Sequence, residues 1–293
     1  MTFKNKINDF LHFFGYCINR VDSTIIDVRD KGNDPRQMYY TRGQILINAP
    51  TNRGRFRFFP LSNTNNPFVH GVAKCINESD KYTIVETTLR EHYNLIQPKN
   101  IFDWYSIDEE DAPSLIDVPV WAAPEPWKQT SIEEKLVSMK KVAANESKKY
   151  KKSLSIFDGD KGFGPVSDEK LQLETIRLIK VMNSIINKGY KRHNGKDGDI
   201  QAFIFMREDG NWSWQVSGGF HRAAVLAGLK WQFIPVRVVS IINRNDVDIW
   251  PNVLSDIYTK KGALKIFDKI FNGSIPIILE DNNFKEIKIN QDV

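Results

Sequence analysis

The sequence predicts an α+β fold, because stretches of helical and of strand-like periodicity both occur and are largely separate along the chain. Three observations support this class: β-branched runs within residues 23–120, apolar residues at helical spacing within 167–188, and a strand, glycine turn and helix within 212–228. We therefore expect four parts: a β-rich N-terminal region (1–120), a linker with a basic helix (121–165), an α+β domain (166–275) and a tail (276–293).

The composition is that of an ordinary folded protein, and the net charge and cysteine content indicate which kinds of partner to expect. The 293 residues have a formal net charge of +5, which permits an anionic partner without requiring nucleic acid. Cys17 and Cys75 have no metal-like spacing, so we expect reduced, buried thiols. No apolar run is long enough to span a bilayer, and the N-terminus lacks the apolar core of a signal peptide. We therefore expect a cytoplasmic protein.

The first 120 residues are expected to begin with an amphipathic helix and to continue mainly as strands. Apolar residues recur at helical spacing over 3–18, which fits either a docked helix or one that binds a membrane surface or a partner. β-Branched runs predict strands at 24–28, 44–47 and 82–85. Alternation within 53–59 predicts another strand, whose basic face either grips a phosphate or acidic glycan or is solvated. That face would present three arginines, Arg53, Arg55 and Arg57.

The middle of the chain is expected to contain a linker, a helix and a loop. Prolines and tryptophans crowd residues 118–127, a pattern typical of an extended linker that packs by its tryptophans. Ser131 suits the N-cap of a lysine-rich helix that runs towards Tyr150 and is either solvated or binds nucleic acid. Residues 158–169 partly imitate a calcium loop, but Phe163 stands where that loop needs glycine. We therefore expect a flexible loop beside the site.

A second long helix is predicted to begin after Ser167, which suits its N-cap. Apolar residues follow it at helical spacing as far as residue 186. Glu169 and Glu174 are the candidates on this helix for the general base that the family resemblance described below implies, and Glu174 lies off its apolar stripe. The alternative for each is an ordinary solvated carboxylate.

The next segment is a basic loop followed by a strand at 200–206, where apolar residues occupy both alternating sets of positions. This pattern predicts a strand that is buried on both faces. The family resemblance described below implies that Asp199 or Asp197, just before the strand, binds a ribose hydroxyl or Mg²⁺, and an ordinary surface loop is the alternative.

Residues 212–228 form the motif around which the chain is organised. Alternation over 212–216 predicts a half-buried strand, and Gly218 and Gly219 allow a tight turn with close approach of a ligand. The helix that follows would end near Gly228, which we expect to be its C-terminal cap. Its free N–H groups and positive dipole end favour an anion. The motif predicts a phosphate-binding turn, with a purely structural turn as the alternative.

The motif also resembles a known superfamily. The run GGFHRAA at 218–224, followed by Gly228 and by IPVRV at 234–238, is similar to the ParB/sulfiredoxin superfamily. The upstream run MNSIINKGY at 182–190 resembles the helix before the first strand of that fold. The match covers about residues 165–242 and implies a ParB/sulfiredoxin-like nucleotide-binding fold in the C-terminal part. Members include CTP-binding partition proteins, ATP-using sulfiredoxins and ParB-like kinases that phosphorylate free serine.

Two of these activities fit the chain less well than the third. Sulfiredoxin chemistry needs a cysteine in the turn, where this chain has Phe220. Partition proteins have a helix-turn-helix DNA-binding domain after the nucleotide fold, and none is evident in this sequence. The resemblance therefore implies a ParB-like kinase that uses ATP and Mg²⁺ to phosphorylate a small-molecule hydroxyl. The acceptor would be a sugar, a sugar-linked intermediate or an amino acid, bound with help from residues 1–120.

This interpretation assigns a role to each candidate residue. The phosphate-binding residues would be Ser217, Gly218, Gly219, His221 and Arg222. The candidate catalytic residues would be Glu174, Glu169 and His221, and the candidate metal ligand would be Asp199. The alternative is a non-catalytic protein that binds CTP or ATP and regulates a partner. The sequence predicts no oligomeric state.

Overall fold

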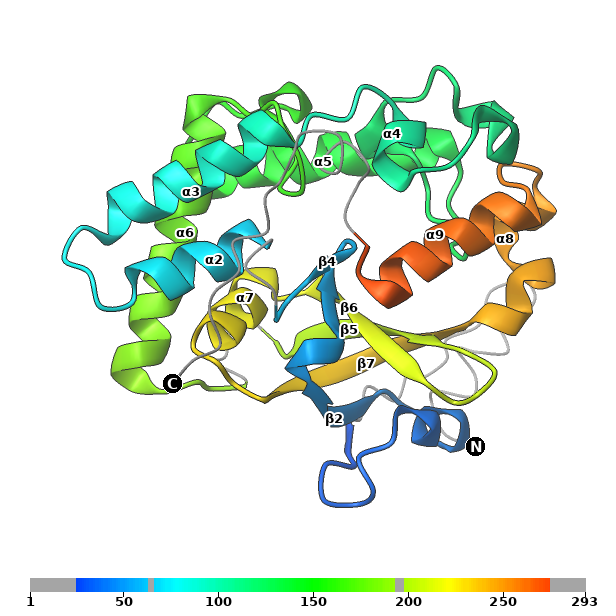
Figure 1. The fold of residues 1–293 in the computed structure, drawn as a ribbon, viewed down its shortest axis with the longest axis horizontal. Helices are drawn as coiled ribbons and strands as arrows, with labels where there is room; N and C mark the ends of the chain where they lie inside the picture. Colours follow the sequence, from blue (N-terminus) through cyan, green and yellow to red (C-terminus); the bar gives the residue numbers. More distant parts are fainter. Residues whose placement is uncertain (1–24, 63–65, 193–197, 275–293) are drawn as a thin grey trace, which may run out of the picture.

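The computed structural model describes residues 25–62, 66–192 and 198–274 and shows a mixed α/β fold built around one sheet (Figure 1). The sheet has seven strands in the order β1-β2-β7-β5-β6-β3-β4. The helix predicted at 3–18, the candidate Asp197 and the tail predicted from residue 276 lie outside the described residues.

The sheet joins the two ends of the described chain. Central β5 pairs antiparallel with β6 and parallel with β7, and these strands are flanked by β3 and β2 respectively. The N-terminal strands therefore extend the sheet of the C-terminal part instead of forming a sheet of their own. The strands are β1 (Ile26–Asp27), β2 (Ile45–Pro50), β3 (Gly54–Phe56), β4 (Phe59–Pro60), β5 (Ile200–Met206), β6 (Trp212–Gly218) and β7 (Phe233–Asn243).

Helices cover the sheet, and several of their ends follow the sequence predictions. Ser131 and Ser167 cap the two long helices as predicted, and Gly273 ends the last helix with a φ of +74°. None of the described helices is both long enough and apolar enough to span a bilayer. The helices are α2 (Pro67–Cys75), α3 (Lys81–Leu95), α4 (Ile101–Tyr105), α5 (Ile132–Tyr150), α6 (Asp168–Lys188), α7 (Phe220–Gly228), α8 (Pro251–Leu254) and α9 (Lys260–Asn272).

The strand predicted at 82–85 is wrong, because these residues lie in the first turns of α3. Asp80 caps this helix by accepting a hydrogen bond from the amide of Thr83. Val85 and Leu89 are four positions apart and fully buried, as on one face of a helix. Their helical spacing therefore decides the structure of this segment, despite its β-branched composition. The N-terminal region is therefore a mixture of short strands and helices, and the β-rich prediction for it is wrong.

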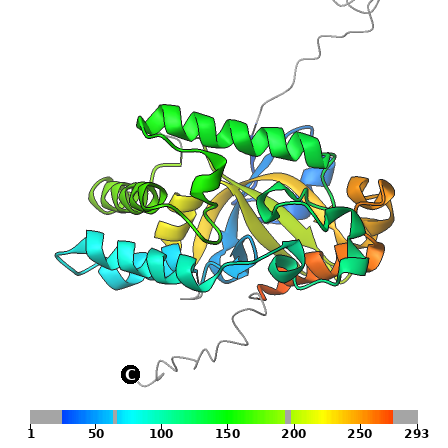
Figure 2. The ribbon, with the colours of Figure 1, turned by 90° about the horizontal axis from the view of Figure 1, so that it is seen from above.

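Two hydrophobic cores lie on opposite faces of the sheet. Ile200, Ala202 and Ile204 of β5 face the first core, whereas Phe203 and Phe205 face the second. Figure 1 shows α2, α3, α6 and α7 gathered on one side and α4, α8 and α9 on the other. Figure 2 shows the helices and the sheet seen from above. The prediction that β5 is covered on both faces is therefore confirmed.

The proline-rich segment packs on the second core through a tryptophan, as its composition predicts. The ring of Trp127 meets the rings of Phe205 and Trp250 edge-on, at centroid distances of 5.0 and 5.5 Å. Asn252 fixes the same segment by donating from its side chain to the carbonyl oxygens of Glu125 and Lys128, at 2.9 Å each. This segment thereby forms one wall of the cavity described below.

Gly228 is the last residue of α7, and it does not have the C-terminal cap role that its position predicts. Glycine is required here for close packing, because a Cβ atom at this position would come within 2.6 Å of Val72 Cγ1. The same atom would lie 3.1 Å from the carbonyl oxygen of Val69. Glycine therefore lets α7 lie directly against α2.

Replacing this glycine tests the close packing. We expect Gly228→Ala to lower the free energy of unfolding by about 1–3 kcal/mol, because the added methyl group has no space. Gly198→Ala is the matched control, since an added Cβ there meets nothing within 4 Å. Chemical denaturation of both variants measures the difference, and equal stability of the two would contradict this account of Gly228.

Candidate functional site

A cavity of about 390 Å³ opens on the sheet next to the glycine turn. Its floor is formed by side chains of β5 and β6, and its walls come from the segment after β3, from α4, from the proline-rich segment and from the loop before α6. Ser217 lines the cavity, which places one predicted phosphate-binding residue at its edge. The polar and charged groups of its lining are Arg57, Tyr105, Glu125, Lys128, Lys161, Gln201, Gln215 and Ser217.

The glycine turn leads directly from β6 into α7. Gly219 is the N-cap residue and has a φ of +78°, a left-handed conformation that favours glycine. A Cβ atom at Gly219 would lie 2.8 Å from Nη2 of Arg222, so the guanidinium group lies over the turn. Nη1 of Arg222 donates to the carbonyl oxygen of Gly198 at 2.7 Å. Arg222 therefore ties the turn to the loop that precedes β5.

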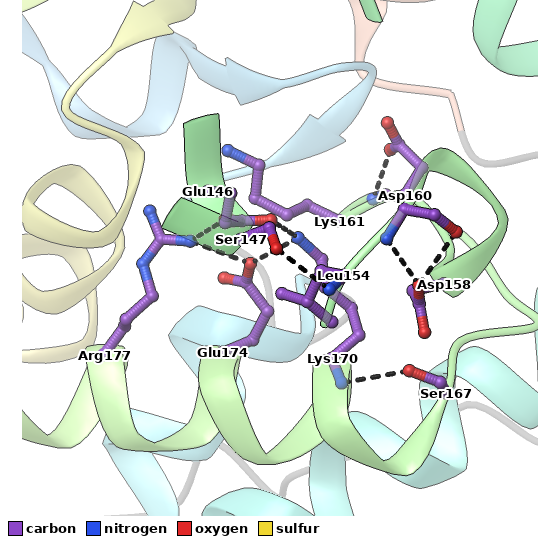
Figure 3. Close-up of polar contacts among 12 residues, drawn as sticks. Glu146, Ser147, Leu154, Asp158, Asp160, Lys161, Ser167, Lys170, Glu174 and Arg177 are labelled. Carbon is purple, nitrogen blue, oxygen red and sulfur yellow. Dashed lines mark hydrogen bonds and ion pairs between the residues drawn. The ribbon is translucent and has the colours of Figure 1, made fainter. Parts of the chain in front are cut away.

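His221 meets Glu174 in a buried ionic network, and Figure 3 shows the part of it formed by Glu146, Lys170, Glu174 and Arg177. Nε2 of His221 lies 2.8 Å from Oε2 of Glu174, whose side chain is 0% exposed. Lys170 and Arg177 each approach Oε1 of Glu174 to 3.1 Å. Glu146, from α5, pairs with the same two cations. Two carboxylates thus balance two cations without a charge on His221.

This balance explains the protonation of the pair. Burial by itself would raise the pKa of Glu174, but the His221 hydrogen bond and the Lys170 and Arg177 charges hold it well below its usual range. Burial lowers the pKa of His221, and the bond to Glu174 offsets only part of that effect. Since an ionised carboxylate can only accept, His221 donates through Nε2–H and is neutral at pH 7.

The structure places the other two predicted carboxylates apart from this pair. Glu169 is exposed in the first turn of α6. Asp199 is buried, and Nε of Arg192 lies 2.6 Å from its Oδ1 atom. Its carboxylate is therefore already ion-paired and fits a metal ion poorly. Among residues 25–62, 66–192 and 198–274, no group of three or more histidine, cysteine or acidic side chains is placed to hold a metal.

The three arginines predicted to share one strand face diverge in the structure. Arg55 is buried, and its guanidinium group donates to the carbonyl oxygens of Gly54 and Phe271. Arg53 lies over the ring of Trp212. Strand β3 ends at residue 56, and the next residue has a φ of +55°, so the expected alternation is broken. The third arginine, Arg57, is the one that lines the cavity.

Sequence reasoning missed most of the charged groups of the cavity. Arg57 pairs with Asp160 at 3.0 Å, and Glu125 pairs with Lys128 at 3.1 Å. Of these residues, Arg57 was predicted on a basic strand face, without its partner. The only signal for Glu125 and Asp160 was the irregular segment that contains each, the proline-rich segment at 118–127 and the glycine-rich loop at 158–165. Lys161, from that loop, lines the same cavity as Ser217, so the loop that was predicted to lie beside the site borders this cavity.

The loop that presents Lys161 is fixed against α3. Nε2–H of His92 donates to the carbonyl oxygen of Gly162 at 3.0 Å, and the hydroxyl of Tyr93 donates to that of Lys161 at 3.2 Å. The amide of Gly164 donates to the carbonyl oxygen of Ile96 at 2.8 Å. Backbone hydrogen bonds at Lys161 and at the residues after it therefore fix the backbone position from which the Lys161 side chain extends.

Comparison of the sequence with protein-family models and with curated proteins finds no match. The function of this site therefore has to follow from its own geometry and chemistry.

Removing the central carboxylate tests the ionic network. We expect Glu174→Gln to lower the free energy of unfolding by about 3–5 kcal/mol, because two buried cations would then share one carboxylate. Glu169→Gln, on the exposed side of the same helix, should change it by less than about 0.5 kcal/mol. Thermal or urea unfolding measures both variants. Equal stability would show that the network does not hold the helices together.

The buried His92 predicts a pH dependence. Burial lowers its pKa from 6.5 to about 4 in the folded state. Below pH 6.5 the unfolded chain binds a proton that the folded chain does not, so stability is full above pH 6.5 and falls towards pH 4, by about 3 kcal/mol. His92→Gln retains a donor for Gly162 but cannot titrate there. We expect its stability to fall less between pH 7 and 4, and parallel curves would contradict this assignment.

Proposed function

We propose that this chain binds a nucleotide in the cavity and transfers a phosphoryl group from ATP to the hydroxyl of a small molecule. The observation that supports this most directly is a cavity lined with cationic side chains that adjoins a glycine turn and a helix N-terminus. The order α6, β5, β6, α7, β7 also supports the proposal that residues 165–242 form a ParB/sulfiredoxin-like nucleotide-binding unit.

The phosphate contacts would come from the turn and from one side chain outside it. Ser217 lines the cavity, and its hydroxyl and the amides of the adjacent Gly218 and Gly219 would donate hydrogen bonds to phosphate oxygens. Lys161 would supply positive charge, since its ammonium group has no ion-pair partner within the described part of the chain. Arg222 would act mainly by holding the turn in shape, because it is bonded to Gly198.

His221 does not itself line the cavity, so it would accept the proton of the acceptor hydroxyl through a bridging water, with Glu174 as the group that orients it. The pair has the arrangement of a general base and its orienting carboxylate. The lowered pKa of His221 keeps the ring neutral at pH 7, so one ring nitrogen is unprotonated. Glu169 has no contact with this pair within the described residues and has no role in the proposal.

A second candidate function is a non-catalytic nucleotide-binding protein that regulates a partner through CTP or ATP. It is favoured by the pairing of three carboxylates, of which Glu125 lines the cavity. Glu125 is held by two lysines, Asp160 by Arg57 and Asp199 by Arg192. None of these three is free to hold Mg²⁺ or to accept a proton. The two functions differ in whether ATP is turned over.

Calorimetry tests the phosphate contact of Lys161. We expect Lys161→Met to weaken ATP binding by about 10- to 100-fold, because one charge-assisted contact to phosphate is lost. Binding of adenosine, which has no phosphate, should be unaffected. Lys149→Met is the matched control, because Lys149 lies on the exposed surface of α5.

Nucleotide choice and turnover then separate the two functions. ATP, CTP, GTP and ADP are titrated with and without Mg²⁺, and ADP release is followed in the presence of hydroxyl compounds. Binding of ATP with ADP release supports the phosphotransferase. Tight CTP binding without turnover supports the regulatory protein. If no nucleotide binds to the folded wild-type chain, both candidates are wrong.

A further inference from the structure

The charges that line the cavity are unequally neutralised. Arg57 is balanced by Asp160 at 3.0 Å. Glu125 pairs with Lys128 at 3.1 Å and with Lys135 at 3.3 Å. The group formed by this one carboxylate and two ammonium groups therefore has one positive charge in excess. The excess charge of this group and the ammonium group of Lys161 together match a phosphate group of two negative charges.

The carboxylate of Glu125 stays ionised but is not available to a ligand cation. Burial would raise the pKa of Glu125, but the charges of Lys135, Lys128 and Arg57 outweigh that effect and lower it to about 2. Two ammonium groups already neutralise this carboxylate. Asp160 is likewise occupied by Arg57. The ammonium group of a free amino acid would therefore find no unneutralised carboxylate in the lining of this cavity.

The remaining polar groups of the lining are neutral hydrogen-bonding groups. The amide of Gln201 has no side-chain partner among the described residues, and Ser217 is exposed at the cavity edge. Gln215 donates through Nε2 to the carbonyl oxygen of Arg57 at 2.8 Å, which leaves its amide oxygen as an acceptor. Amide groups of this kind can both donate to and accept from hydroxyl groups.

Aromatic rings line the same cavity next to these amides. Phe203 lies on β5 two residues after Gln201, and alternation along the strand places both side chains on the same face. Phe56, Phe58 and Tyr105 complete the aromatic part of the lining. Burial raises the pKa of Tyr105, so its hydroxyl remains neutral. Apolar rings with a few neutral hydrogen-bonding groups suit a ligand whose C–H faces pack on the rings while its hydroxyls bind the amides.

We propose that the acceptor is a neutral, hydroxyl-rich molecule of the sugar or polyol class, bound by Gln201 and Gln215 beside Phe203. This inference rests on the proposed phosphotransfer. An acceptor hydroxyl oxygen forms the new bond to the γ-phosphorus of ATP, the bond from that phosphorus to the β–γ bridging oxygen breaks, and ADP leaves. The hydroxyl proton passes through a water to His221, which does not itself line the cavity.

The first experiment measures ADP release by the wild-type chain with ATP and Mg²⁺. One pool of acceptors contains neutral sugars and polyols, including hexoses, N-acetylhexosamines, inositol and glycerol, and a second pool contains the twenty free amino acids. We expect the first pool to raise ADP release at least tenfold above the rate without acceptor, and the second to leave it unchanged. Stimulation by the amino acids, or by neither pool while ATP binds, would overturn the acceptor class.

A variant at the cavity floor provides the second measurement. Gln201→Leu should raise the KM for the stimulating acceptor at least tenfold while the Kd for ATP changes less than twofold. Gln172→Leu, on the exposed surface of α6, is the matched control and should change neither. An unchanged KM in a folded Gln201→Leu protein would contradict the role of this amide. Absence of ATP binding to the wild type would instead reject the phosphotransferase itself.

Discussion

The buried ionic network of Glu146, Lys170, Glu174, Arg177 and His221 is the constraint on which the arrangement of α5, α6 and α7 depends. A buried charge is costly unless it is paired and hydrogen-bonded, so these helices can pack only where all four ionised groups meet. The position of α7 follows from this, because His221 in its first turn is bonded to the network. The start of α7 in turn fixes the glycine turn at the cavity edge.

The cavity joins parts of the chain that are remote in sequence. Its floor comes from β5 and β6, whereas Arg57, Glu125 and Lys161 come from three irregular segments outside residues 165–242. Those segments are held by ion pairs and by backbone contacts to α3. The site is thus built jointly by the sheet and the glycine turn, and by walls from segments far from them in the sequence.

Local features of the fold were predictable from the sequence, whereas long-range ones were not. The caps Ser131 and Ser167 and the turn at Gly219 depend on residues close in sequence, and all three predictions are confirmed. Glu174 is a residue whose environment could not be predicted from the sequence. It lies off the apolar stripe of its helix, and its burial depends on cations and a histidine that periodicity cannot reveal. Of the predicted site residues, Ser217 lines the cavity and His221 contacts Glu174, whereas most of the charged wall residues were not predicted.

The pairing of the early strands β2 and β3 with strands from the C-terminal part of the chain has a consequence for the order of folding. The indole of Trp214 donates to the carbonyl oxygen of Pro50, a contact between residues 164 positions apart, and β2 and β3 flank the three C-terminal strands. Such non-local pairings form slowly, because a long loop must close before any contact is gained. During synthesis the early strands have no partner until β5, β6 and β7 have emerged, and their unpaired edges are exposed to other chains for that interval.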